Sequence, residues 1–262
     1  MTTTQTFTEE TTSVAGLANR VLVGGEGPRL HWLHLSTGSL GWLPLHEKLS
    51  EKFRVVVPDL PGFGQSERPT WARHPRDIAM LMQRMAANHA SDPYLLVGHG
   101  FGGWIAAEMA TMNPEALSGL VLVGAAGIQP NEGEIMDLIM WDYDDYVKQG
   151  FSDDAAFNTA FGEEVDKEVR ELWDFSREMT ARLTWKPWMF NRQLPPLLPE
   201  VATPSLLVWG EHDRVIPLDC AKQFEAALPN ATLEIVSGAG HLLEMEQPET
   251  LAALITGFAD NA

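Results

Sequence analysis

The chain has 262 residues, of which 45% are apolar and 21% are charged, and its formal net charge is -18. These values are typical of a folded globular protein and exclude a largely disordered one. The acidic balance, with a pI near 4.7, excludes nucleic acid as a partner, because phosphate binding needs clustered Lys and Arg.

The amino-terminal stretch has no basic region followed by an apolar run, and no apolar stretch reaches the roughly 20 residues that span a bilayer. We therefore expect no membrane partner. The single cysteine, Cys220, cannot form an internal disulfide and fits a reducing compartment, so we expect a cytoplasmic location. The Thr-rich first dozen residues are predicted to be a frayed tail.

Short apolar runs alternate with amphipathic segments along the chain. The runs predict strands at 14–24, 30–35, 55–57, 95–97, 119–123, 205–209 and 232–236. Helical spacing predicts helices at 43–53, 76–90, 104–110, 218–228 and 248–258. This alternation favours a parallel, doubly wound sheet with crossover helices on both faces. From about residue 128 to 196 the strand-like runs stop, and the segment is acidic, helix-favouring and rich in aromatics.

One turn between a strand and a helix has a pattern that points to chemistry. Gly98, His99, Gly100, Phe101 and Gly102 follow the apolar run at 95–97. The pattern Gly-X-nucleophile-X-Gly at such a turn is a nucleophile elbow, in which the middle residue is strained and its side chain stands above the sheet. Here the middle residue is Gly100, which offers no nucleophilic atom.

Four further motifs follow in a familiar order, and with the elbow they resemble the α/β-hydrolase superfamily. They are HLSTG at 34–38, VVVPDLPGFGQS at 55–66, LLVWGEHDRVIP at 206–217, and SGAGH followed by EQPE within 237–249. The resemblance covers most of the chain. It implies an α/β fold of the α/β-hydrolase type: a mostly parallel, doubly wound, eight-stranded sheet with a helical cap inserted after strand six. Residues 1–127 and 197–262 would form the core, and residues 128–196 the cap.

The resemblance also assigns catalytic positions. In the family a serine attacks an acyl carbonyl, a histidine takes its proton, and an acid orients the histidine. The matching positions are Gly100, His241 and Asp213. Two backbone N–H groups, at Ser36 and Phe101, match the positions of the oxyanion hole.

A second departure lies in the oxyanion loop, where the family usually has His-Gly and this chain has His34-Leu35. Loss of that glycine restricts the backbone and weakens the case for ordinary ester hydrolysis. Residues from this loop, from the cap and from the position after His241 are predicted to bind substrate: His34, Leu35, Met136, Met140, Trp141, Trp185, Met189 and Leu242. The alternative for the cap aromatics is that most of them only pack the cap on itself.

Gly100 leaves three explanations open. The serine was removed deliberately, or His241 activates a water toward an ester, lactone or similar carbonyl, or the protein only binds a small ligand. A C–C hydrolase also stays open, whereas the lack of an aspartate at position 100 argues against haloalkane dehalogenases and epoxide hydrolases. His31 and His34 lack an adjacent carboxylate or thiol, so we expect no metal and no cofactor. The expected partner is a small molecule, and the oligomeric state stays open.

Overall fold

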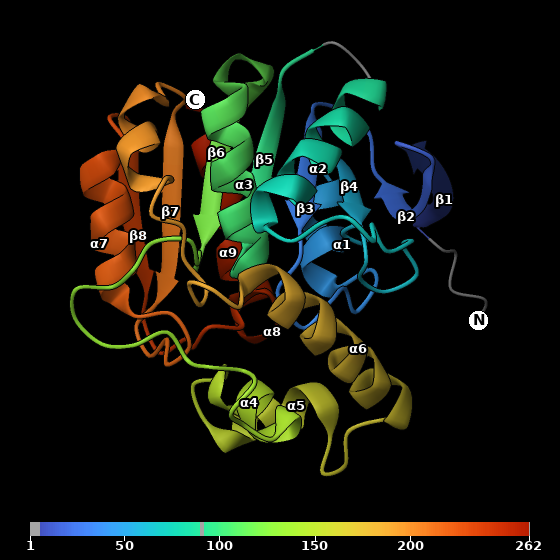
Figure 1. The fold of residues 1–262 in the computed structure, drawn as a ribbon, viewed down its shortest axis with the longest axis vertical. Coiled ribbons are helices and arrows are strands. Elements are labelled where there is room, and N and C mark those ends of the chain that lie inside the picture. The colour runs from blue at the N-terminus through green and yellow to red at the C-terminus, as the bar shows by residue number, and fades with distance from the viewer. Residues whose placement is uncertain (1–5, 90–91, 262) are drawn as a thin grey trace.

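One eight-stranded sheet organises the chain in the computed structural model, which describes residues 6–89 and 92–261 (Figure 1). The strand order is β1-β2-β4-β3-β5-β6-β7-β8, and every neighbouring pair from β4 to β8 is parallel. The strands are β1 Phe7–Val14, β2 Leu17–Gly24, β3 Arg29–Leu33, β4 Arg54–Pro58, β5 Tyr94–His99, β6 Leu117–Val123, β7 Ser205–Gly210 and β8 Ala231–Val236. The predicted fold class is therefore confirmed.

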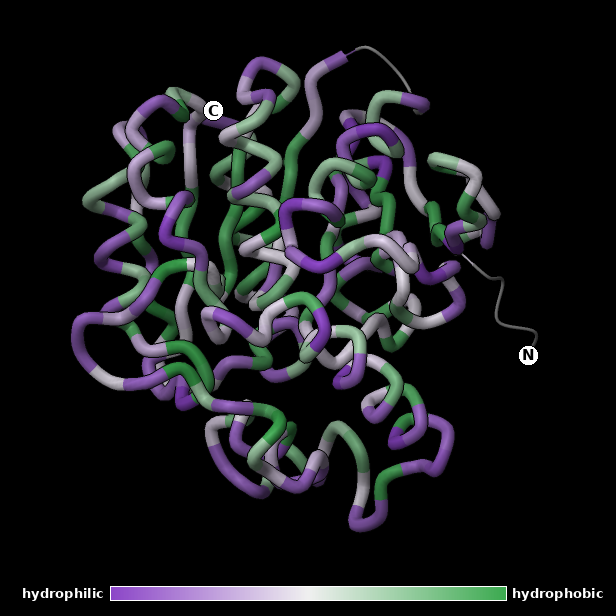
Figure 2. The backbone as a smooth tube through the Cα atoms, in the orientation of Figure 1, coloured by the Kyte–Doolittle hydropathy of each residue, from purple (hydrophilic) through white to green (hydrophobic). Residues whose placement is uncertain are grey.

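Helices cover both faces of this sheet, and its central strands are accordingly buried on both sides. One buried layer includes side chains of α2, α3 and α7, and the other includes side chains of α1 and α9. In Figure 2 the hydrophobic colour accordingly follows the central strands. The helices of the core are α1 Pro44–Ser50, α2 Pro75–His89, α3 Phe101–Met112, α7 Leu218–Ala227, α8 Leu243–Glu246 and α9 Pro248–Ala259, with 3-10 turns η1 Pro114–Ala116 and η2 Pro195–Glu200.

The amino-terminal hairpin differs from the prediction of a frayed tail. Residues 7–12 lie in β1, which pairs with β2 along its full length, while residues 1–5 lie outside the described part. The turn at Ala15 and Gly16 has positive φ at both residues, the geometry that matches the twist of two antiparallel strands. The exposed threonines of β1 suit an edge strand. The polar composition of this segment therefore did not indicate a frayed tail.

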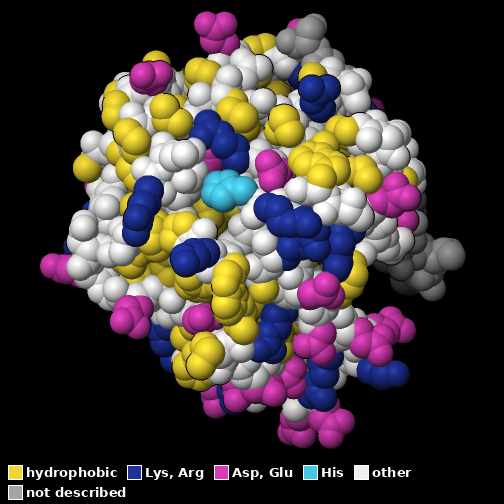
Figure 3. Space-filling model, viewed as in Figure 1, with side chains coloured by type: hydrophobic (Ala, Val, Ile, Leu, Met, Phe, Trp, Pro, Cys, Tyr) yellow, Lys and Arg dark blue, Asp and Glu magenta, His cyan; other side chains and the backbone are white. Residues whose placement is uncertain are grey.

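Between β6 and β7 lie three helices, α4 Tyr143–Gln149, α5 Asp154–Phe161 and α6 Lys167–Thr184. The chain leaves and rejoins the core at one point, where Gly127 pairs with Phe190. We call residues 128–189 between them the helical insert. Figure 1 shows the insert beyond the carboxyl ends of β6 and β7. Acidic side chains gather at that end of the molecule in Figure 3. The predicted boundaries at 127/128 and 196/197 stay a prediction.

Candidate active site

The tight turn between β5 and α3 explains the glycines of the elbow motif. Gly100 has φ 55° and ψ -112°, a conformation that side-chain-bearing residues rarely adopt. A β-carbon on Gly98 would stand 2.3 Å from the Gly102 carbonyl oxygen, and one on Gly102 would stand 2.2 Å from the Leu33 carbonyl oxygen. Only glycine fits at these two flanking positions, so the backbone at position 100 has the elbow geometry although no side chain is present.

A histidine and an aspartate from distant loops meet beside this turn. The Nδ1 atom of His241 lies 2.7 Å from Oδ2 of Asp213. A carboxylate only accepts, so Nδ1 donates its hydrogen, and in the neutral ring the lone pair is then on Nε2. The second carboxylate oxygen accepts from the backbone N–H groups of Val215 and Ile216, at 2.9 and 2.8 Å. Asp213 is thus held by its own loop and fixes the tautomer of His241.

The free nitrogen of His241 faces the elbow. A β-carbon built on Gly100 would stand 3.0 Å from Nε2 of His241. His241 is 5% exposed and the Asp213 side chain 2%, so both lie largely out of bulk water. A neutral Nε2 in this position can accept a proton from a group that occupies the space above Gly100.

Leu35 occupies the other side of the same space. Its Cδ2 atom would lie 2.6 Å from a β-carbon on Gly100, and its side chain is buried. That separation is below any ordinary contact between carbon atoms. Gly100 and Leu35, the two departures from the family pattern, therefore touch each other.

The loop at Ser36, which is the predicted oxyanion loop, contacts two residues of the helical insert that the sequence did not single out for this role. Thr180 Oγ1 on α6 donates to the carbonyl oxygen of Ser36 at 3.1 Å. Burial raises the pKa of the Tyr146 hydroxyl on α4 well above its usual range, while an interaction with the Ser36 side chain acts the other way. Phe101 stands at the first turn of α3, where backbone N–H groups have no partner within the helix. Nothing in the spacing of Tyr146 or Thr180 reveals these long-range contacts.

Two histidines near the site have structural roles. His34 Nε2 accepts from the Leu60 N–H at 3.0 Å, and Nδ1 donates to the Leu35 carbonyl at 2.7 Å. Both nitrogens of His34 are engaged, which argues against a polar contact between this ring and substrate. His99 Nε2 donates to the His241 carbonyl at 2.7 Å and so supports the loop that carries His241. Among the described residues there is no group of His, Cys, Asp and Glu arranged to hold a metal ion.

The predicted pocket residues of the insert separate into buried and exposed ones. Met140, Trp141 and Trp185 are 80%, 41% and 64% exposed, which does not fit a role in lining an enclosed pocket. Met189 is buried, and Met136 is partly buried beside the acid loop, where its N–H donates to the Val215 carbonyl. The rings that pack the insert together are others, namely Tyr143, Tyr146, Phe151, Phe157, Phe161 and Trp173.

Leu242 follows His241 in the chain, and its side chain points toward Gly150. A β-carbon on Gly150 would stand 2.0 Å from its Cδ1 atom, and its backbone N–H donates to the Gly150 carbonyl at 2.9 Å. Its side chain therefore packs on the end of α4, and its predicted contact with substrate stays a prediction.

A model of the alpha/beta hydrolase family matches residues 21–254, which is most of the chain and includes the elbow, Asp213 and His241. The chain belongs to the alpha/beta hydrolase family. Among the described residues of this hydrolase-family protein, none of the helices combines the length and apolarity needed to cross a bilayer.

Relatives with named activities are similar along nearly the whole chain. The 2-hydroxymuconate semialdehyde hydrolase of Pseudomonas sp. (strain CF600) is 27% identical over 95% of this chain and 92% of its own. The pimeloyl-[acyl-carrier protein] methyl ester esterase of Vibrio atlanticus (strain LGP32) is 26% identical over 90% of this chain and 96% of its own. The crystal structure of a bacterial membrane phospholipase A superposes with a TM-score of 0.83 at 25% identity, covering 98% of this chain and 86% of that one.

Proposed function

We propose that this protein hydrolyses a small ester, lactone or related carbonyl compound by activating a water molecule, without a covalent intermediate. The observation that carries the proposal is the position of His241, whose Nε2 is 3.0 Å from the β-carbon position of Gly100 and whose Nδ1 is bonded to Asp213. A base and its orienting acid are in place, and the chain itself supplies no nucleophile at position 100.

The reaction follows from these positions. The water oxygen attacks the carbonyl carbon while its proton passes to Nε2 of His241, and Asp213 stabilises the imidazolium that forms. The negative oxygen of the tetrahedral intermediate is stabilised by the N–H groups of Phe101 and Ser36. When the intermediate collapses, the bond to the leaving group breaks and the leaving group takes the proton from Nε2. His241 returns to its starting state, and one water has been consumed.

The substrate class is supported by the relatives. One of them is named for a methyl ester and another for 2-hydroxymuconate semialdehyde. Both names fit carbonyl chemistry, so the same class is proposed for this chain.

A direct test measures turnover of short p-nitrophenyl esters, small lactones and a 2-hydroxymuconate semialdehyde by the unmodified protein. Turnover of at least one substrate, with no acyl adduct in the mass spectrum of protein quenched during turnover, supports the water mechanism. An acyl adduct would overturn it, since it would show a nucleophile on the chain.

A second function, ligand binding without catalysis, is favoured by Leu35. Its Cδ2 atom lies 2.6 Å from the β-carbon position above Gly100, so it narrows the space in which chemistry would occur. The contact also supports a natural origin for Gly100. Deliberate removal of a serine would change position 100 alone, and it would not explain why Leu35 overlaps the space that a side chain at position 100 would fill. If no substrate in the panel turns over while one of them binds saturably, the protein is a binding protein.

A further inference from the structure

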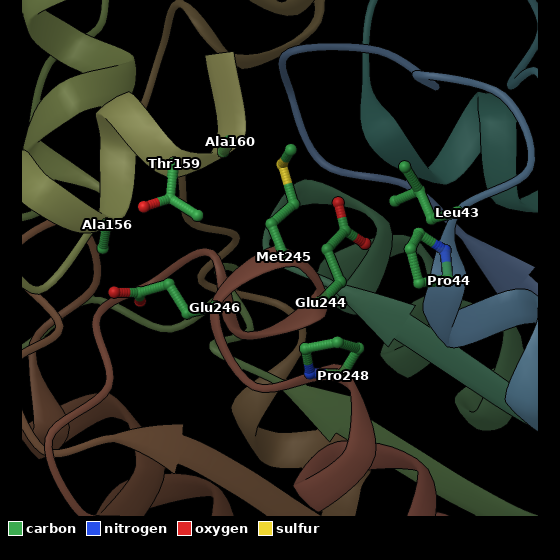
Figure 4. Close-up of a pocket in the computed structure, with 9 residues that line it drawn as sticks. All are labelled: Leu43, Pro44, Ala156, Thr159, Ala160, Glu244, Met245, Glu246 and Pro248. Carbon is green, nitrogen blue, oxygen red and sulfur yellow. The ribbon is translucent and has the colours of Figure 1, made fainter. Parts of the chain in front are cut away.

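A pocket lies between the helical insert and the core. It has a volume of about 540 Å³, within the range of roughly 300 to 1,000 Å³ that is usual for small-molecule sites. Helix α5 provides one wall, and the start of α1, α8 and the start of α9 provide the others (Figure 4). Its lining residues are Leu43, Pro44, Ala156, Thr159, Ala160, Glu244, Met245, Glu246 and Pro248. None of the proposed catalytic residues is among them.

Most of this lining is apolar, but a buried carboxylate belongs to it. Glu244 is 5% exposed. Its Oε2 atom is closed off from solvent and lies 3.3 Å from Nδ1 of His99. Its Oε1 atom has no hydrogen-bond partner in the described part of the chain and is not among the atoms closed off from solvent. In the view of Figure 4 the Glu244 carboxylate points into the space between Met245 and Leu43.

The charge of Glu244 is maintained despite its burial. Burial raises the pKa of this carboxyl group, but the His99 ring beside it, with smaller contributions from His46 and His34, outweighs burial and lowers the pKa below its usual range. The His99 ring faces Oε2, so Oε1 is the oxygen that a hydrogen-bond donor in the pocket can reach.

The other carboxylate of the pocket is already engaged. Glu246 Oε1 accepts from the Ser152 N–H at 2.7 Å, and Oε2 accepts from the Gly240 N–H at 2.6 Å. Thr159 Oγ1 donates to the Ala155 carbonyl, so it offers no donor to Glu244. The acceptor that a ligand would meet is therefore Glu244 Oε1, and the negative charges of the pocket disfavour an anionic ligand.

We propose that this pocket binds a small amphiphilic amine, with its ammonium group on Glu244 Oε1 and its hydrocarbon part against Leu43, Met245 and Pro248. The ammonium donates to the unpaired oxygen and neutralises the charge, and the hydrocarbon buries apolar surface on both the insert and the core. This site goes beyond the proposed hydrolysis and does not depend on it.

Isothermal titration calorimetry of the 262-residue protein with n-hexylamine at pH 7.5 tests the proposal. We expect saturable binding of hexylamine, no saturable binding of hexan-1-ol or hexanoate, and an affinity at least roughly tenfold lower in Glu244→Gln. Glu225→Gln removes the same charge from an exposed position on α7 and should leave the affinity unchanged. Equal binding of hexan-1-ol, or unchanged affinity in Glu244→Gln, would overturn the proposal.

A second variant covers the case in which Glu244→Gln fails to fold. Ala156→Phe on α5 fills the pocket from the insert side and leaves Glu244 in place. Loss of saturable hexylamine binding in this variant, with an unchanged circular dichroism spectrum, supports the site. Retention of the full affinity shows that the amine binds elsewhere and rejects the proposal.

Discussion

The side chain of Leu35 lies over the α-carbon of Gly100, with Cδ2 only 2.6 Å from the place where a β-carbon would stand. The two residues come from different loops, one after β3 and one after β5. Each fits the other, because a side chain at position 100 has room only if the Leu35 side chain shifts. A serine restored at position 100 should therefore lower the free energy of unfolding, and the elbow motif alone does not reveal this effect.

We expect Gly100→Ser to lower the free energy of unfolding by about 2 to 4 kcal/mol, because it combines a side chain at positive φ with overpacking against Leu35. Urea-induced unfolding measures this loss. The control is Gly16→Ser, which has φ 82° but nothing within 4 Å of the new β-carbon, so it isolates the cost of the backbone conformation. Equal losses in the two variants would show that Leu35 moves aside freely.

The double variant Gly100→Ser with Leu35→Gly should gain esterase activity that the single serine variant lacks. Removal of the leucine side chain lets the introduced serine adopt its position beside His241, and a nucleophile misplaced by about 1 Å costs roughly 10²-fold in rate. Initial rates on p-nitrophenyl acetate check this, with Gly100→Ala and Leu35→Gly together as the control without a hydroxyl. A double variant no faster than that control would mean that Asp213 and His241 do not activate a serine.

Replacement of Asp213 by Asn should reduce turnover by the unmodified site about 10²-fold or more. The 2.7 Å contact with Nδ1 fixes the tautomer of His241, and an amide in its place no longer stabilises the imidazolium. The measured quantity is kcat for the best substrate of the panel. Asp260→Asn, which removes an exposed acid from the end of α9, should leave kcat unchanged, and equal kcat in the two variants would refute the role of Asp213.

His46 should make stability depend on pH between about 6.5 and 4. Burial lowers the pKa of His46 to about 4, so in this window the unfolded chain takes up a proton that the folded protein does not. The free energy of unfolding then falls as the pH is lowered, by about 3 kcal/mol for this residue between pH 7 and pH 4.

Urea unfolding of His46→Gln at pH 7 and at pH 4 isolates that contribution, since the variant lacks the titrating ring. Its stability should fall by about 3 kcal/mol less than that of the unmodified protein. The exposed His212, replaced by Gln, serves as the matched control. An identical fall in all three proteins would contradict the expectation.

Features that depend on local backbone geometry or on the order of motifs could be predicted from the sequence. Gly98 and Gly102 are required because their β-carbons would meet backbone atoms, and such a requirement is visible in a short motif. The resemblance placed Asp213 and His241 in the expected chain order, and the two side chains do meet.

Long-range packing set the limit of prediction. The contact of Leu35 with Gly100, and the bond from Thr180 to Ser36, join residues whose spacing follows no local period. The exposed Met140 and Trp185 resemble their buried neighbours in composition, so their places depend on how the helices of the insert pack. The pairing of the polar strand β1 with β2 depends likewise on its partner strand.

The most direct test of the account is the ratio of kcat/KM between the unmodified protein and His241→Ala for its best carbonyl substrate. If His241 is the general base for water, the ratio should be about 10² to 10⁴, and His212→Ala should leave kcat/KM unchanged. A ratio near one would contradict the account, because turnover would then not depend on the nitrogen that faces Gly100.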